Sequence, residues 1–217
     1  AITGDGQAFI TALDATTAAD LDEIATDLTI DLGANNVALA ANATLDVATG
    51  KTLTVTSTAA TDYELDVSAI DANGVFTVDG DISVSSATTL KMTAAQATTE
   101  TITGAGSVVI TALDATTAAD LDGIATDLTI DLGTTNATLV AGATISVADG
   151  KALTVTSVDN GNGSATRLDV TSANTFDIGA GSSVALANDE TELALTAAQA
   201  TGHAITGDGQ AFITALD

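Results

Sequence analysis

The chain has 217 residues, enough for one large domain or for two domains of about 100 residues each. Apolar residues make up 46% of it but aromatic residues only 2%, so Ala, Val, Leu and Ile must build any core. Cysteine and proline are absent, which excludes a disulfide framework. The formal net charge of -25 argues against nucleic acid and anionic membranes as partners, because such a surface repels phosphate.

Long internal repeats organise the chain. The stretch TALDATTAADLD begins at Thr11 and again at Thr111, an offset of 100 residues; between Leu65 and Leu168 the offset becomes 103. The opening fourteen residues, AITGDGQAFITALD, return unchanged from Ala204. We therefore divide the chain into repeat 1 (1–100), repeat 2 (101–203) and the start of a third repeat (204–217, the same as 1–14).

The first element predicted after the opening stretch is a short helix. DATTAADLDEIAT, from Asp14, offers a capping aspartate and places Leu21 and Ile24 on one helical face. In repeat 2, Gly123 replaces Glu23, which weakens this helix or ends it earlier.

Short strands dominate the rest of each repeat. They are indicated by apolar-x-apolar triplets separated by Gly, Asn, Asp and Thr, and they return about every nine residues. Every second strand is separated by roughly 16 to 20 residues, the size of one coil of a β-solenoid. The triplets begin at Leu28, Val37, Leu45, Leu53, Leu65, Phe76, Ile82, Leu90 and Val108.

Two further features complete each repeat. TAAQ, at Thr93–Gln96 and Thr196–Gln199, matches the S/T-x-x-E/Q capping box and predicts a single helical turn. The extra residues of repeat 2 lie in VDNGNGSATR, after Ser157, and an insertion tolerated there predicts a surface loop.

Two all-β architectures fit this pattern. A β-solenoid with short helical turns explains the short strands, the scarcity of aromatic residues and the absence of proline, because each coil must pair its backbone with the next. Tandem β-sandwich domains are the alternative, since they fit the repeat length. Asp149–Gly150, between alternating apolar residues, would then be a hairpin turn.

The sequence offers little for catalysis, and we expect no enzyme. His203 is the only histidine, and the corresponding position of repeat 1 is Glu100, so a surface turn is the simplest interpretation. Arg167 lies in the inserted loop, and the equivalent lysines of the two repeats indicate architecture rather than chemistry. Lys51 and Lys151 are the equivalent pair, and Lys91 is the third lysine.

Ca²⁺ is the one metal that the sequence suggests, and no cofactor is required. Two groups of oxygen-bearing side chains are its candidate ligands, although neither fits EF-hand spacing and Asp-Asn-Gly clusters usually form turns. Loose binding of cations to the acidic face is the alternative. The candidate groups are Asp71, Asn73, Asp79 and Asp81, and Asp159, Asn160, Asn162 and Asp169.

A threonine ladder would suit an ice-binding solenoid, which is a minor alternative. KTLTVTST supplies Thr52, Thr54 and Thr56, but repeat 2 has Ala152 at the first of these places. Solvent-facing threonine is also simply a good strand former.

ATLDVATGKTLTVTS, ATISVADGKALTVTS and LTAAQATGHAITGDG resemble the repeats of large bacterial surface and secreted proteins. These include giant adhesins, autotransporter-like passengers, sheath proteins and S-layer proteins. The resemblance implies an extracellular or cell-surface location, and a non-catalytic structural segment of a fibre, sheath or filament. The partners it implies are copies of the same chain, joined end to end or laterally. A stalk or binding region of an adhesin that recognises surface glycans is the alternative.

The repeated ends fit an open-ended structure. The chain lacks an initial methionine and a leader, which predicts a mature form or an excerpt, and it has no apolar run of the length that spans a membrane. The copy at Ala204 predicts either a window cut from a longer tandem array or separate chains that stack end to end.

Overall fold

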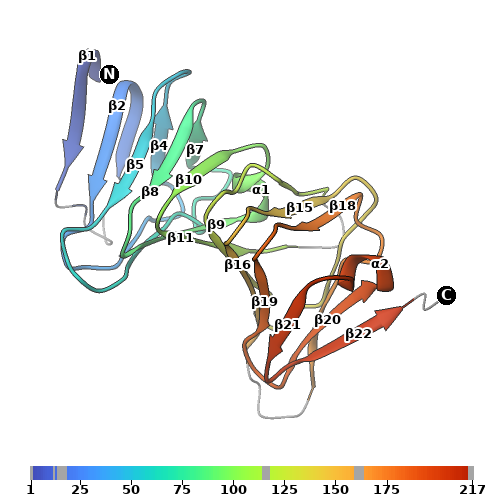
Figure 1. Cartoon of the computed structure of the whole chain (residues 1–217). Helices are drawn as coiled ribbons and strands as arrows, with labels where there is room; N and C mark the ends of the chain where they lie inside the picture. The colour runs from blue at the N-terminus through green and yellow to red at the C-terminus, as the bar shows by residue number, and fades with distance from the viewer. Residues whose placement is uncertain (1, 12, 14–18, 114–117, 159–163, 215–217) are drawn as a thin grey trace. The chain divides into compact units, whose positions relative to one another are not determined.

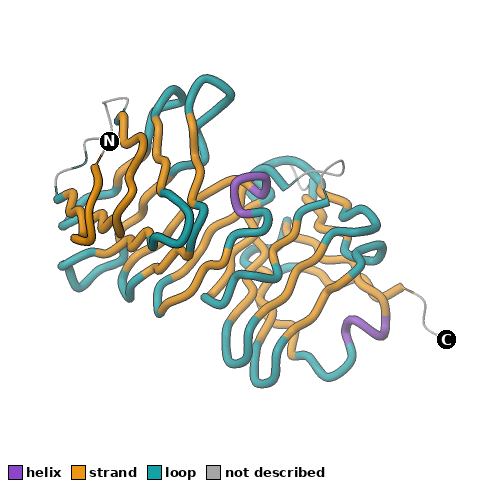
Figure 2. Tube along the Cα trace, turned by 90° about the horizontal axis from the view of Figure 1, so that it is seen from above, coloured by secondary structure: helices purple, strands orange, loops and turns teal. Residues whose placement is uncertain are grey.

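The computed structural model describes residues 2–11, 13, 19–113, 118–158 and 164–214. These residues are mostly β-strand, and the helices among them are two single turns (Figure 1, Figure 2). The chain forms two compact units: Ala1–Gln96 with Glu100–Val109, and Ala97–Thr99 with Ile110–Asp217.

Unit 1 consists of short parallel strands. One sheet has the order β10-β8-β5-β2-β4-β7, with β1 paired to β2, while β11, β9, β6 and β3 pair in that order in another. Its elements, with α1 and β11 at its boundary, are β1 (Ile2–Ile10), β2 (Asp20–Asp31), β3 (Val37–Ala38), β4 (Thr44–Val47), β5 (Leu53–Thr56), β6 (Tyr63–Asp66), β7 (Val75–Val78), β8 (Asp81–Val84), β9 (Thr88–Thr93), α1 (Ala94–Ala97), β10 (Thr101–Gly104) and β11 (Ser107–Thr111).

Unit 2 repeats this arrangement. One sheet has the order β12-β15-β18 and another the order β14-β17-β20-β22, while β13, β16, β19 and β21 pair in that order. The elements are β12 (Asp120–Leu121), β13 (Asp127–Asp131), β14 (Ala137–Thr138), β15 (Thr144–Val147), β16 (Ala152–Thr156), β17 (Thr166–Asp169), β18 (Thr175–Ile178), β19 (Ser183–Leu186), β20 (Thr191–Thr196), α2 (Ala197–Ala200), β21 (Ala204–Gly207) and β22 (Gln210–Thr214).

From β4 to β9 the chain returns to the same sheet position three strands later, whereas β8 and β10, like β19 and β21, are partners two strands apart. After β4, β5 and β6, the next three strands β7, β8 and β9 pair with them in the same order. Leu45 thus lies opposite Phe76, and Leu28 lies opposite Leu53. The predicted separation of 16 to 20 residues is therefore too short at these places. It assumed that every second strand would pair, whereas here every third strand does.

Aliphatic side chains lie in register from strand to strand in the core. The parallel register forms a row in which each residue lies opposite the next on the neighbouring strand, and each is fully buried. The row is Leu28, Leu53, Ile82 and Ile102. Removing such a side chain from water contributes about 1.5 to 3 kcal/mol. This in-register layering, together with the short triplets, explains why the core needs almost no aromatic residue.

The predicted strands and capping boxes are confirmed. Each predicted triplet falls in or overlaps a strand, and the all-β class is correct. Each TAAQ begins a helical turn: Gln96 N donates to Thr93 Oγ1 at 3.2 Å, and Thr196 and Gln199 form the complete capping box at α2.

The helix predicted from Asp14 is wrong where the structure describes it. Residues 14–18 lie outside the described residues, and Asp20–Asp31 is the long strand β2. Leu21 and Ile24 instead pair with Leu45 and Val47 of β4, with an irregularity between them. Packing of these aliphatic side chains against β4 overrides the helical propensity of Ala and the acidic residues.

The hairpin at Asp149–Gly150 is also wrong. The flanking strands β15 and β16 do not pair with each other; β15 pairs with β12 and β18, and β16 with β13 and β19. Every strand pair with a defined register in the described residues is parallel, whereas tandem sandwiches require antiparallel pairs. The Asp-Gly turn, with Gly150 at φ 72°, redirects the chain between sheets.

Candidate functional site

The candidate metal ligands serve the local backbone. Asp71 Oδ1 accepts hydrogen bonds from Asn73 N and Nδ2 at 2.8 and 3.0 Å, and Asp169 Oδ1 accepts from Thr171 N at 3.0 Å. Asp79 Oδ2 accepts from the Thr49 hydroxyl at 3.3 Å. Asp81 opens β8 with an exposed side chain. The remaining candidates, Asp159, Asn160 and Asn162, lie outside the described residues.

Other acidic and amide side chains clamp one strand circuit to the next. Asp27 Oδ1 accepts from Thr52 N at 3.0 Å, and in repeat 2 Asp127 Oδ1 accepts from Ala152 N at the same distance. Asn36 Oδ1 accepts from Glu64 N at 2.9 Å. Asn136 receives the N–H of Arg167 at 2.7 Å. Our sequence reasoning missed these clamps, although the recurrence of Asn36 at Asn136 between changed neighbours was a signal for them.

Acidic residues do not face one another where the parallel strands are in register; at the irregularity of the β2–β4 pair, Asp22 and Glu23 lie alongside Asp46. In the described strand pairs with a defined register, every Asp or Glu lies opposite Thr, Ser, Ala, Gln, Lys or Arg. Two acidic side chains at adjacent strand positions would repel, by about 1 kcal/mol at 4 Å in water and more where the site is partly buried. The pairs include Asp20–Thr44, Asp31–Thr56, Asp46–Thr77, Thr101–Asp81, Asp131–Thr156, Ser146–Asp177 and Glu192–Gln210.

The basic side chains neutralise individual acids. Lys91 Nζ lies 3.1 Å from Asp66 Oδ2, across the β6–β9 pair. Arg167 donates through Nε to Glu192 at 2.8 Å, and its guanidinium lies 4.5 Å from the centre of the Phe212 ring. Lys51 and Lys151 occupy equivalent tight turns, as expected from the repeats; their backbone N–H groups donate to Ala48 and Ala148.

Glu100 has a strongly perturbed carboxyl group. Burial, followed by the charge of Asp79, raises the pKa of Glu100 from 4.5 to about 7. His203 occupies the corresponding place in repeat 2, where it is partly buried after a turn. Its backbone N–H donates to Ala200 O at 3.4 Å. The sequence comparison placed the two residues together but gave no sign of the pKa, which depends on burial.

The threonine ladder is short and mixed. Thr54 lies opposite Thr29 and Ser83, and Ser83 lies opposite Thr103, which gives a column of hydroxyls on unit 1. In unit 2 the corresponding column contains Ala185. Thr52 precedes β5 and its backbone is bound by Asp27, while Thr56 lies opposite Asp31. An acidic, interrupted ladder of this kind does not favour ice binding.

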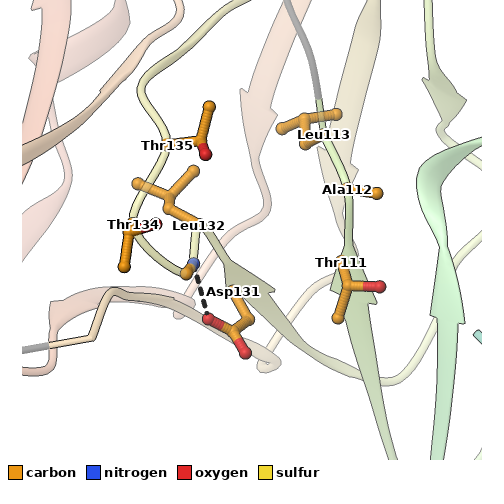
Figure 3. Close-up of a pocket in the computed structure, with 8 residues that line it drawn as sticks. Thr111, Ala112, Leu113, Asp131, Leu132, Thr134 and Thr135 are labelled. Carbon is orange, nitrogen blue, oxygen red and sulfur yellow. Dashed lines mark hydrogen bonds between the residues drawn. The ribbon is translucent and has the colours of Figure 1, made fainter.

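The hollow of unit 2 drawn in Figure 3 has a volume of about 360 Å³. Leu113 and Leu132 lie on its two walls, with Thr135 beside Leu132. Its acidic residue, Asp131, accepts the N–H of Gly133 at 2.9 Å, and Asp31 and Gly33 form the same turn in repeat 1 at the same distance. The hollow therefore borders a recurring structural turn.

Neither a cluster of metal-ligating side chains nor a membrane-spanning helix occurs among the described residues. Among them, no three His, Asp or Glu side chains gather closely enough to hold a metal ion. The described helices include none with the length and apolar character of a membrane span.

Comparison with known proteins identifies no relative, so the function has to be inferred from the residues of this chain. The chain matched no family model, no curated protein and no solved structure.

Proposed function

We propose that this chain is a structural, non-catalytic repeat segment of an extracellular bacterial fibre, sheath or cell-surface filament. It is built as a β-solenoid in which three strands, or two strands and a helical turn, make one coil, and it associates with copies of itself. The three-strand return of the chain to parallel, in-register partners is the observation that carries the proposal. Such a stack extends along one axis by adding coils, which is what a filament requires.

The use of the polar side chains supports a structural role. The clamps made by Asp27, Asp127, Asn36 and Asn136 recur at equivalent places and bind backbone N–H groups, so these groups hold coils together. The net charge of -25 keeps an otherwise apolar chain soluble. Cations, Ca²⁺ included, bridge acidic faces of neighbouring filaments loosely in this proposal, without a dedicated site.

The bacterial and extracellular assignments rest on the resemblance of the repeats to surface proteins. Absence of cysteine fits that setting, because no free thiol is exposed to oxidation. A stalk or binding region of a glycan-binding adhesin is the rival proposal. It predicts isolated particles that bind glycans, without lateral or end-to-end order.

Electron micrographs of the purified chain test the proposal. We expect filaments or ordered rows, far-UV circular dichroism dominated by β-structure, and a meridional reflection near about 4.8 Å from aligned material, which is the spacing of stacked strands. Isolated particles at every concentration would refute the self-associating function. A melting temperature unchanged by chelator, together with unchanged lateral order, would remove the calcium bridge.

A further inference from the structure

The fourteen-residue segment AITGDGQAFITALD has different partners at its two positions (Figure 1). In unit 1, Gln7–Ile10 pairs with Asp27–Ile30 of β2, which follows it in the chain. In unit 2, the identical Gln210–Ile213 pairs with Glu192–Leu195 of β20, which precedes it. One sequence therefore shows its contact with a following strand at one position and with a preceding strand at the other.

The two contacts use opposite edges of the segment. In unit 2, Ala194 O accepts from Val170 N at 2.9 Å, so the backbone groups of Ala194 point toward β17. Along a parallel strand the backbone N–H and C=O groups of successive residues point to alternate sides. Those of Leu193 therefore point toward β22. Ala211, opposite Leu193, therefore points away from β20, to the edge of β22 that has no partner in the described residues.

In unit 1, the backbone groups of the equivalent alanine, Ala8, point toward a partner strand. Leu28 N donates to Thr52 O at 2.9 Å, so Leu28 points toward β5. Ala8, opposite Leu28, therefore points toward β2. Ala8 and Ala211 are the same position of the segment, so the edge that pairs with β2 in one copy is the edge left open in the other.

A glycine of the segment marks the other edge. Gly207, at φ 104°, lies so close to Leu186 O that a Cβ would overlap that atom, and Gly104 of the related stretch TITGAG has the same relation to Val84 O. Gly4, the same position as Gly207, keeps a positive φ of 132° although nothing approaches within 4 Å of where its Cβ would be. The first copy thus carries the glycine that a preceding strand requires.

Burial of the related stretch shows the state that the segment reaches when it is covered. Ile102, Val108 and Ile110 are fully buried there. In the identical copies, Ile2 is 46% exposed and Ile213 is 36% exposed. Since β22 is also uncharged, it lacks the usual features by which an edge strand resists pairing.

We propose that the segment at 204–214 of one chain replaces the segment at 2–11 of a second copy, by pairing its open edge with β2 of that copy. The inference rests on the proposed self-associating function and names its interface. β22 would take the register of β1, with Ala211 opposite Leu28 and Phe212 opposite Thr29. Replacement is favoured over simple stacking because the structure already contains the contact of this sequence with β2.

Proline substitutions at the matched alanines separate the two roles. Ala8→Pro removes a backbone donor that points toward β2, so it releases the first copy and opens the acceptor. Ala211→Pro leaves the pairing with β20 in place, because Ala211 points away from it, but removes the donor from the open edge. The double variant has an open acceptor without a competent donor strand.

Sedimentation equilibrium of the full chain over a hundredfold range of concentration measures the outcome. We expect Ala8→Pro to raise the average mass above that of the unaltered chain, toward higher multiples of 21.2 kDa, and the double variant to stay at 21.2 kDa with the same circular dichroism. Fluorescent AITGDGQAFITALD peptide should bind the double variant at least tenfold more tightly than it binds Ala211→Pro. A peptide with proline at its eighth residue should not bind.

The alternative outcomes overturn the proposal in distinguishable ways. Equal assembly of Ala8→Pro and the double variant would place self-association on another surface and leave the proposed function standing. Assembly of the unaltered chain that is lost in Ala8→Pro would indicate stacking without replacement. A folded Ala8→Pro variant that stays monomeric and binds no peptide would refute the replacement. Isolated particles of the unaltered chain in micrographs would, separately, refute the proposed function.

Discussion

Gln96 does two jobs that one substitution series can separate. Its Oε1 accepts from Thr93 N at 2.8 Å and so completes the cap of α1. Its Nε2 donates to Val67 O at 2.9 Å, which ties the helical turn to the residue that follows β6. Each hydrogen bond contributes about 1 kcal/mol net, and Val67 O keeps a second donor, Ile70 N, so no bare carbonyl remains. We therefore expect Gln96→Ala to lower the free energy of unfolding by about 2 kcal/mol.

Urea unfolding followed by circular dichroism measures this loss, and the melting temperature should fall by about 4 to 8 °C for a chain of this size. Gln96→Glu keeps the acceptor but turns an acceptor oxygen toward Val67 O. Gln96→Glu should therefore lower the free energy of unfolding by at least about 1 kcal/mol, the contribution of the hydrogen bond to Val67 O. Gln199, which donates to Val170 O at 2.8 Å, should give the same result in repeat 2.

Gln210→Ala is the matched control, since its exposed side chain should change stability by less than about 0.5 kcal/mol. A Gln96→Ala variant as stable as this control would refute the reasoning. A Gln96→Glu variant as stable as the unaltered chain would show that the cap alone matters.

Three further predictions concern single side chains. Thr99 has a φ of 69° where repeat 2 has Gly202 at 84°, so Thr99→Gly should stabilise the chain by up to about 1 kcal/mol, and Gly202→Thr should destabilise it by about 1 to 2 kcal/mol, in urea unfolding. Because the folded pKa of Glu100 is about 7 and the ordinary value is 4.5, the folded state holds the proton longer, so stability should fall as pH rises from 4.5 to 7. Glu100→Gln should remove that part of the slope in melts across this range, and an unchanged slope would contradict the assignment. Thr56→Asp would create an acid opposite an aspartate of β2, whereas Thr54→Asp would lie between hydroxyls; the first should melt lower at low salt, and the gap should close at a salt concentration of about 1 M.

The sequence predicted local features whose causes are local. The triplets beginning at Leu28 and Leu53 were sufficient to place strands, because alternation of apolar residues reports one buried face directly. The capping boxes of Thr93 and Thr196 were also readable, since all their atoms lie within one helical turn. Features that depend on a partner far along the chain were harder to predict.

The errors share that physical origin. Asp20–Asp31 carries helix-forming residues, yet Leu21 and Ile24 are drawn into pairing with β4, which no local pattern announces. Asp149–Gly150 has hairpin chemistry, but β15 and β16, which it joins, pair with other strands of their own sheets instead of with each other. The circuit length was underestimated for the same reason, because spacing between triplets does not say which of them pair.

In the solenoid that we propose, the placement of the acids gives a reason for a sequence repeat much longer than one coil. Identical coils stacked in parallel register would put each Asp directly beside its own copy, about 4.8 Å away, along an entire face. In a chain of net charge -25 that repulsion would accumulate with every coil. The observed pairs instead set Asp31 against Thr56 and Asp66 against Lys91. Successive coils therefore have to differ, and identity returns only after several coils, where like acids no longer face one another. A long repeat built of unlike coils is thus what the proposed acidic, in-register stack requires if it is to be extended.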